Sequence, residues 1–216
     1  MRYNSMNRII FALLGLLLYS MPIIAQNEPQ SIIAKQLFIE VPDSLFPSID
    51  KNTRLDMIDY YECGYNRPSL DVFKDSCKIS HIDDENIIIE TSPILKQQIS
   101  VLSNNIILLI STHSIPTHDS EIEFYDFNWN KLESNQHFTS PKLYDWLSKE
   151  GKKKQQDIEN YIPFLITEYQ YNSNDKTLTL INNLQDYFTD SDWNKIAPLL
   201  LTQLKYKWAG GKFKKK

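Results

Sequence analysis

Glycine and cysteine are both scarce in this chain. Only 5 of the 216 residues are glycine and only 2 are cysteine. Loops that cradle phosphate groups need glycine where the backbone approaches the ligand, so this scarcity argues against a nucleotide-binding loop. The sequence also lacks the local signatures of a nucleophile elbow and of a metalloprotease helix. No cofactor is therefore expected, and a catalytic site would have to be assembled from carboxylates scattered along the chain.

Residues 1–25 have the pattern of a cleaved secretory signal peptide. Arg2 and Arg8 supply a positive segment, and the uncharged apolar run 9–18 is too short to span a membrane comfortably. Cleavage is expected before Gln26, after a small residue. No cysteine occurs early enough to be the acylated cysteine of a lipoprotein. We expect a protein of the periplasm or the extracellular space, with no transmembrane segment after the signal peptide.

Acidic residues outnumber basic ones. The formal net charge is −4, and removal of Arg2 and Arg8 with the signal peptide lowers it to −6. Nucleic acid is therefore not an expected partner. Positive charge nevertheless gathers at 152–154 and 212–216. A solvated loop and a frayed tail would explain these two runs, and docking to an anionic surface is the alternative.

Two segments have the pattern of a short amphipathic helix. In 53–64, Thr53 is a candidate N-cap with Asp56 three residues later, and Gly64 is a candidate C-terminal stop. In 140–151, a serine and a proline open the segment and a glycine closes it. The apolar stripes expected to face the core are Leu55, Ile58 and Tyr61 in the first segment and Leu143, Trp146 and Leu147 in the second.

Each predicted helix is followed by strand patterns in the same order. Hairpins are predicted over 96–110 and 164–181, and each is followed by a strand ending in tryptophan, over 121–129 and 200–208. This order predicts an old tandem duplication, with a first α+β unit at 26–135 and a second at 136–216, within one compact structure. The expected fold class is α+β, with helices packed on one face of an antiparallel sheet. The first unit has further strand material at 70–73 and 87–89.

The two cysteines, Cys63 and Cys77, would lie in an oxidising compartment after export. A disulfide between them would close a loop of about 15 residues and contribute roughly 3 kcal/mol in the chain-entropy model. The alternative is two independent small apolar residues. Sequence does not fix the distance between the two Cβ atoms, so both alternatives stay open.

A weak candidate metal site comprises His113, His118 and Asp119. Two imidazoles and a carboxylate are zinc ligands, but a five-residue separation across a proline-containing loop matches no standard ligand spacing. A polar loop between strands is the favoured interpretation. The acidic segments 83–85 and 172–175 lack the central glycine and distant glutamate of a calcium loop, and turn chemistry explains both.

Aromatic residues also occur inside an acidic segment, 185–193. Tyr187, Phe188 and Trp193 are apolar material that a simple connection does not need, so they are candidates for a recognition surface. The favoured alternative is that these rings fold back to cover the sheet.

Three segments resemble a family of exported Bacteroidales proteins catalogued as domain of unknown function 3256. They are Pro-Asp-Ser-Leu at 42–45, 52–61 with Arg-Leu-Asp-Met-Ile-Asp as its strongest part, and 119–126 running to Trp129. The resemblance covers nearly the whole chain after the signal peptide, and it implies an export signal, an α+β fold and no assigned activity. Histidine is not typical of the family at positions 113 and 118, which weakens the metal hypothesis. The helix-then-sheet order is also similar to the β-lactamase-inhibitor-protein and PepSY-like architectures, an analogy that transfers no function.

The leading functional hypothesis is a non-catalytic binding module that contacts a protein or an envelope polymer. It depends on the aromatic-rich strands and loops and on the lack of catalytic motifs. The alternative is an envelope hydrolase whose site combines scattered carboxylates with the loop histidines, and a structural envelope component is a third hypothesis. A deep polar pocket with perturbed pKa values would favour the enzyme, whereas a broad exposed patch would favour the binding protein.

Overall fold

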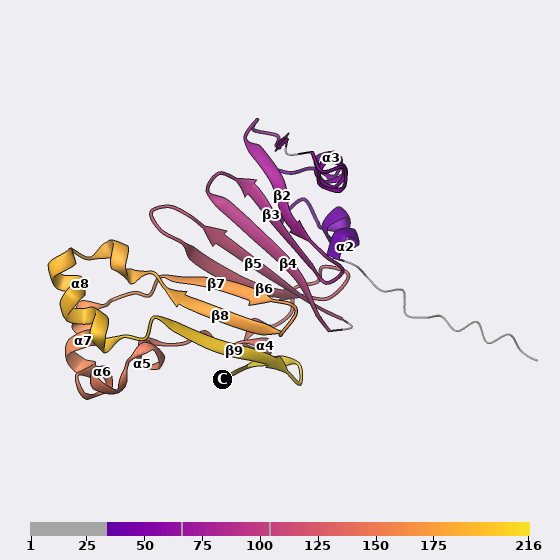
Figure 1. Cartoon of the computed structure of the whole chain (residues 1–216). Coiled ribbons are helices and arrows are strands. Elements are labelled where there is room, and N and C mark those ends of the chain that lie inside the picture. The colour runs from indigo at the N-terminus through magenta and orange to yellow at the C-terminus, as the bar shows by residue number, and fades with distance from the viewer. Residues whose placement is uncertain (1–33, 66, 104) are drawn as a thin grey trace, which may run out of the picture. The chain divides into compact units, whose positions relative to one another are not determined.

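The computed structural model describes residues 34–65, 67–103 and 105–216, which combine short helices with two antiparallel sheets (Figure 1). The predicted α+β fold class is therefore confirmed. The predicted signal peptide, 1–25, lies outside the described residues. Within these residues, no helix is both long and apolar enough to cross a membrane.

The first sheet has six strands, and each pairs with the next along the chain. The predicted hairpin over 96–110 is confirmed as the fourth and fifth strands of this sheet. The strands are β1 (Ser69–Leu70), β2 (Ser76–Ile82), β3 (Asn86–Ser92), β4 (Leu95–Ser103), β5 (Ile106–His113) and β6 (Asp119–Tyr125).

Both faces of this sheet bury apolar side chains at β5. Ile107 and Leu109 point into a core shared with α2 (Ala34–Glu40) and α3 (Lys51–Glu62), and Leu108 and Ile110 point into a core shared with the second sheet. Successive side chains of a strand alternate between the two faces, so a continuous apolar run is what such a strand requires.

Helix α3 begins earlier than the sequence pattern predicts. The N-cap is Asp50, not Thr53, and its carboxylate accepts a hydrogen bond from the Thr53 amide at 2.8 Å. That hydrogen bond lowers the pKa of Asp50. The predicted stripe is also only partly correct, because Ile58 is buried whereas Leu55 and Tyr61 are exposed. The buried face of α3 comprises Arg54, Met57 and Ile58.

The second sheet has four strands in the order β10-β9-β8-β7. The predicted hairpin over 164–181 is confirmed, although β7 starts only at Thr167. The strand predicted over 200–208 begins only at Gln203, and Leu204, Tyr206 and Trp208 are buried on one of its faces. The strands are β7 (Thr167–Asn172), β8 (Thr177–Asn182), β9 (Gln203–Ala209) and β10 (Lys212–Lys215).

Side chains, not a backbone ladder, join the two sheets. The Asp119 carboxylate accepts a hydrogen bond from the Thr167 amide at 3.0 Å, and the Ser120 hydroxyl accepts one from the Tyr169 amide at 3.0 Å. The amide of buried Gln98 donates to the Tyr171 carbonyl at 2.8 Å. These contacts satisfy backbone groups at the outer edge of β7, which an open sheet edge would otherwise expose.

The predicted single helix over 140–151 is wrong. The segment forms α5 (Leu143–Trp146) and α6 (Lys149–Lys153), and between them Leu147 is extended and forms a β-bridge with Leu200. Ser148 then caps α6 by accepting a hydrogen bond from the Gly151 amide at 3.1 Å. A contact with a residue about fifty positions away therefore interrupts a pattern that reads locally as one helix.

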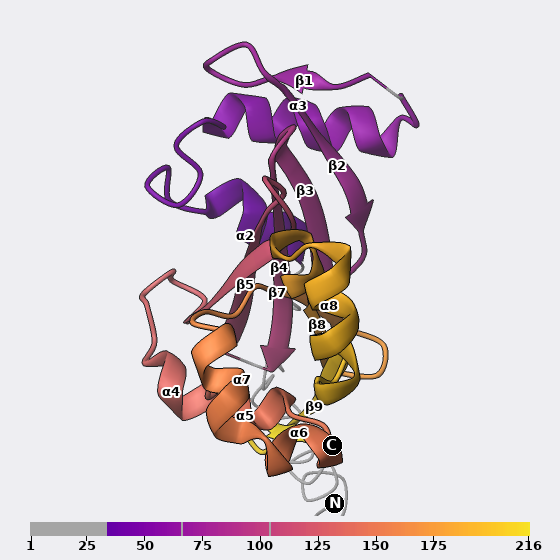
Figure 2. The same cartoon turned by 90° about the vertical axis from the view of Figure 1, so that its left-hand side faces the viewer.

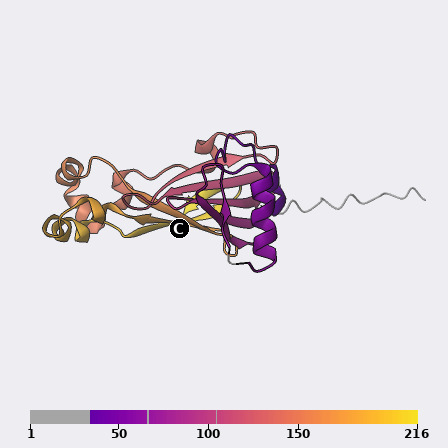
Figure 3. The ribbon, with the colours of Figure 1, turned by 90° about the horizontal axis from the view of Figure 1, so that it is seen from above.

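Short helices beyond the second sheet enclose a third core of Leu147, Ile158, Ile162, Leu184, Ile196 and Leu200. Figures 2 and 3 show α6, α7 and α8 grouped together, at the opposite end of the strands from α3. The remaining elements are α4 (Ser134–His137), α7 (Gln155–Tyr161), η1 (Leu184–Tyr187), α8 (Asp190–Ile196) and η2 (Ala197–Leu199).

The two halves of the chain differ in their helices and in strand number. The predicted boundary at residue 135 falls within α4, between the two sheets. The strand predicted over 121–129 ends at Tyr125. Trp129 lies after a turn, and its own φ is 62°. The tandem duplication and the division into two units therefore stay predictions.

Candidate functional site

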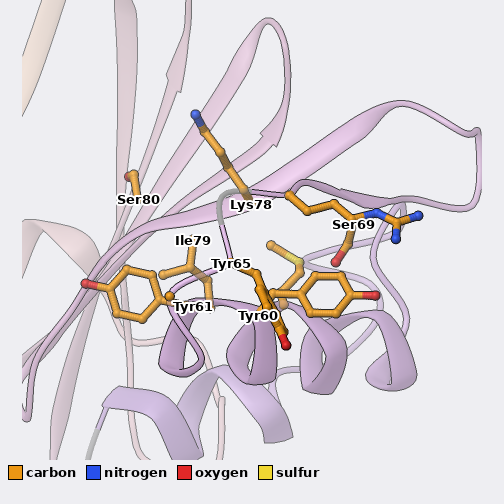
Figure 4. A pocket seen from close by; sticks show the side chains of 10 residues that line it. Tyr60, Tyr61, Tyr65, Ser69, Lys78, Ile79 and Ser80 are labelled. Atoms are coloured by element: carbon orange, nitrogen blue, oxygen red, sulfur yellow. The ribbon is translucent and has the colours of Figure 1, made fainter.

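A cavity of about 370 Å³ lies between α3 and the strands β1 and β2 (Figure 4). Its volume falls within the range of small-molecule sites. Three tyrosines within six residues of sequence line it, Tyr60, Tyr61 and Tyr65. The other lining residues are Met57, Gly64, Arg67, Ser69, Lys78, Ile79 and Ser80.

The end of α3 brings the tyrosines together. Gly64 has a φ of +69°, the left-handed conformation that favours glycine, and its amide donates to the Tyr61 carbonyl at 3.1 Å. The Tyr65 amide donates to the Tyr60 carbonyl at 2.9 Å, which completes a Schellman motif. The chain therefore turns back on itself, and the rings of Tyr60 and Tyr65 meet edge to face at 6.3 Å.

Opposite the helix, β1 and β2 form the other wall. Ser69 is 8% exposed, and its hydroxyl oxygen has no hydrogen-bond partner among the described residues. Figure 4 shows this side chain and that of Ile79 pointing toward α3, while Lys78 and Ser80 extend from the other side of β2. A buried hydroxyl without a partner costs free energy, so the Ser69 hydroxyl would gain from a hydrogen bond if the wall of the cavity shifted to expose it.

Two polar contacts fix this wall. The Tyr61 hydroxyl accepts a hydrogen bond from the Ile82 amide at 3.3 Å, which ties the end of β2 to α3. The Lys78 ammonium forms an ion pair with Glu90 at 3.2 Å, directed along the sheet. Arg67 is thus the lining cation without an ion-pair partner among the described residues.

The hairpin that carries Ser69 also exposes apolar side chains. The strand predicted over 70–73 is reduced to β1, and the rest is a turn in which the Asp71 carboxylate accepts hydrogen bonds from the Phe73 and Asp75 amides. This turn leaves Leu70, Val72 and Phe73 between 53% and 73% exposed. A cluster of large exposed apolar side chains is typical of a contact surface.

The candidate metal residues are not assembled into a metal site. His113, at the end of β5, and Asp119, at the start of β6, are register partners. The Asp119 carboxylate, however, accepts backbone hydrogen bonds, and the His118 imidazole lies 3.2 Å from the Glu168 carboxylate. Within the described part of the chain, no group of three His, Cys, Asp or Glu side chains could hold a metal ion. The acidic segments 83–85 and 172–175 are turns, in which Asp83 and Asn172 accept hydrogen bonds from amides two residues later.

Two of the aromatic residues of 185–193 pack on the helical core, whereas the favoured alternative predicts that the rings cover the sheet. Phe188 and Trp193 are partly buried there, with ring centroids 6.2 Å apart. Tyr187 is 41% exposed and meets Phe164 edge to face at 5.3 Å. A recognition role for these three residues stays a prediction.

The structure contains no disulfide between Cys63 and Cys77. Both cysteines are free, with Cys63 exposed just after α3 and Cys77 buried in β2. Burial, and to a smaller extent the charge of Asp71, raises the pKa of the Cys77 thiol to about 11. The alternative of two independent cysteines therefore describes the structure.

The tyrosines of the cavity are recognisable as a group in the sequence, but the helical pattern led to a different interpretation of them. Tyr60, Tyr61 and Tyr65 surround a glycine stop, but helical periodicity assigned Tyr61 to the core. Ser69 gave no signal, because its burial and its lack of a partner depend on the packing of β1 against α3.

The fold and the cavity define an α+β protein with a small, tyrosine-lined pocket at a helix–sheet junction. The sequence model described as "Protein of unknown function (DUF3256)" matches residues 26–213, and the chain belongs to this family. A domain of an uncharacterized protein from Porphyromonas gingivalis W83 is similar in structure, with a TM-score of 0.69 at 18% identity over 84% of this chain and 96% of that chain. At this identity the likeness shows the fold alone. A comparison with curated proteins gave no match.

Proposed function

We propose that this protein is exported to the periplasm or the cell exterior and binds a sugar unit of an envelope polymer in the tyrosine-lined cavity, without catalysing a reaction. The observation that carries the proposal is the cavity of about 370 Å³ itself, which is lined by Tyr60, Tyr61 and Tyr65 together with Arg67. The signal-peptide pattern of residues 1–25 supports export.

The chemistry of the lining supports binding of a sugar. Tyrosine offers a flat apolar face together with a hydroxyl group, which suits a ligand that presents both C–H and O–H groups. Arg67 adds a cation that can bind a carboxylate or phosphate group on the polymer. The exposed side chains of Leu70, Val72 and Phe73 on the adjoining hairpin extend the contact surface beyond the cavity.

An array of purified neutral and acidic glycans, including soluble peptidoglycan fragments, tests the proposal. The protein should bind at least one glycan class, and Tyr65→Ala should weaken that binding about tenfold, which corresponds to about 1.4 kcal/mol. Tyr161→Ala removes an exposed tyrosine from α7, outside the cavity lining, and should leave binding unchanged. If no glycan binds, or if both variants lose binding equally, the proposal is wrong.

A further inference from the structure

The outer face of β9 and β10 carries a row of lysines. The run 212–216 is not the frayed tail expected from sequence, because β10 pairs with β9 through Lys215. Trp208 and Phe213 are buried on the inner face, so the lysines that alternate with them point outward. This lysine face comprises Lys205, Lys207, Lys212, Lys214 and Lys216.

The strand register concentrates like charges on this face. Lys207 lies directly opposite Lys214, and the Lys216 amide donates to the Lys205 carbonyl at 2.9 Å, which makes these two residues neighbours as well. Cross-strand neighbours have Cβ atoms about 5 Å apart, and like charges there destabilise a sheet. Among the described residues, no carboxylate lies within ion-pair distance of these five lysines, whereas Lys215 on the inner face pairs with Asp145 at 3.3 Å.

Uncharged polar residues continue the same rows across the sheet. Lys205 is opposite Thr179, which is opposite Gln170, and Lys207 is opposite Thr177. Three interstrand spacings of about 4.8 Å make this face about 14 Å wide. Gln170 is also a lining residue of a groove of about 240 Å³ between the two sheets, with Lys96, Gln98 and Thr112 among the others.

Two carboxylates on neighbouring parts of β7 and of the turn after it already have hydrogen-bond partners. Glu168, one row further along β7, is buried and is held by His118 at 3.2 Å and by Gln170 at 2.9 Å. Asp175, in the turn between β7 and β8, accepts a hydrogen bond from the Thr177 amide at 3.1 Å. None of the five lysines therefore has an ion-pair partner among the described residues, although the protein as a whole carries a net negative charge.

We propose that the lysine face, with the rows leading to the groove, binds a segment of an anionic polysaccharide. The ammonium groups would pair with repeated carboxylate, sulfate or phosphate groups, and Thr179 and Gln170 would hydrogen-bond sugar hydroxyls. The rows present no aromatic side chain on which a nucleic-acid base could stack. They also present no large exposed apolar side chain that would insert into a membrane. This surface is separate from the tyrosine-lined cavity, so either proposal can fail alone.

The test is affinity measurement with heparin and with polygalacturonate, a sulfated and a carboxylated polysaccharide. The protein should bind at low salt, and binding should weaken as salt rises. Replacement of both Lys207 and Lys214 by glutamine should weaken binding about tenfold. The matched control replaces Lys149 and Lys152 of α6 by glutamine, which removes the same charge from a different surface and should change binding less than about twofold.

Each outcome decides the proposal. Absence of binding to both polysaccharides overturns it, and so does an equal loss in the two double variants, which would indicate non-specific attraction. Tighter binding to anionic lipid vesicles or to a single-stranded oligonucleotide than to either polysaccharide also contradicts it. Circular dichroism of the variants separates loss of the surface from loss of the fold. Retention of polysaccharide binding in Tyr65→Ala would show that this surface acts independently of the cavity.

Discussion

Gly64 and Gly151 are required for different physical reasons. At Gly64 the backbone conformation favours glycine, but a Cβ atom would meet nothing within 4 Å. At Gly151 a Cβ atom would lie 2.1 Å from the Leu199 carbonyl oxygen, because α6 packs directly against the backbone of η2. A substitution at Gly64 therefore tests the cost of a left-handed backbone conformation, and a substitution at Gly151 tests the close approach of the α6 and η2 backbones.

Gly151→Ala is expected to lower the free energy of unfolding by about 2 to 3 kcal/mol, because the backbone of η2 must move to admit the methyl group. Gly64→Ala should cost about 1 kcal/mol, the penalty for a left-handed residue with a Cβ atom. Urea denaturation of both variants measures the two values. Equal losses would contradict the close packing of α6 against η2.

The two cysteines are expected to differ strongly in reactivity. Cys63 is exposed and should react at once with a thiol reagent at pH 8, whereas buried Cys77 should react only after addition of denaturant. If both thiols react slowly in the folded protein, or if neither reacts in the unfolded protein, the assignment of one exposed and one buried free cysteine is wrong.

The raised pKa of Cys77 also predicts a loss of stability at alkaline pH. Between the pKa of an unfolded thiol, near about 8.5, and the folded value of about 11, the folded state retains a proton that the unfolded state releases. The free energy of unfolding should therefore fall as pH rises through this window. Urea denaturation at several pH values should show a shallower fall in Cys77→Ala, and an identical slope would contradict the prediction.

At the scale of elements, the attachment of β7 to β6 depends on Asp119 and Ser120. Asp119→Ala removes the acceptor of the Thr167 amide and should cost about 1 kcal/mol. Glu121→Ala, an exposed change on the same strand, should cost less than about 0.5 kcal/mol. Hydrogen exchange should be faster at the Thr167 amide in the first variant only. If the exchange rate of the Thr167 amide is unchanged in Asp119→Ala, the hydrogen bond between Asp119 and Thr167 does not hold the edge of β7 against β6.

Sequence periodicity predicted the strands better than the helices. The buried set in β9 and both hairpins follow from alternation and turn residues, which are local features. The prediction of one helix over 140–151 is wrong because Leu147 pairs with Leu200, a residue far away in the sequence. The prediction of a frayed tail over 212–216 is wrong because this segment pairs with β9, which the local sequence does not show. The cavity depends on how β1 and β2 pack against α3, which local periodicity does not show, so only its tyrosines were visible in the sequence.

For the whole molecule, export is directly testable. The full chain expressed in a bacterial host should be found in the periplasm or the medium, and mass spectrometry should give a chain that begins at Gln26. Leu14→Arg places a charge in the apolar run and should leave the chain uncleaved in the cytoplasm. A wild-type chain that keeps residues 1–25 in the cytoplasm would contradict the export proposal.

The proposed export and binding would give a use to both the tyrosine-lined cavity and the lysine face. A protein that meets the cell envelope can use the tyrosine-lined cavity for a single sugar unit and the lysine face for an extended anionic segment. The two surfaces are built on different sheets, so variants in one should not alter binding at the other.

The most direct test of the central claim is a two-dimensional NMR titration of the isotope-labelled protein with a glycan that binds on the array. The account predicts that the largest shifts occur at the amides of Tyr60, Gly64, Tyr65 and Ser69, which surround the cavity. Shifts confined to other surfaces, with these amides unchanged at saturation, would contradict the claim that the cavity is the binding site.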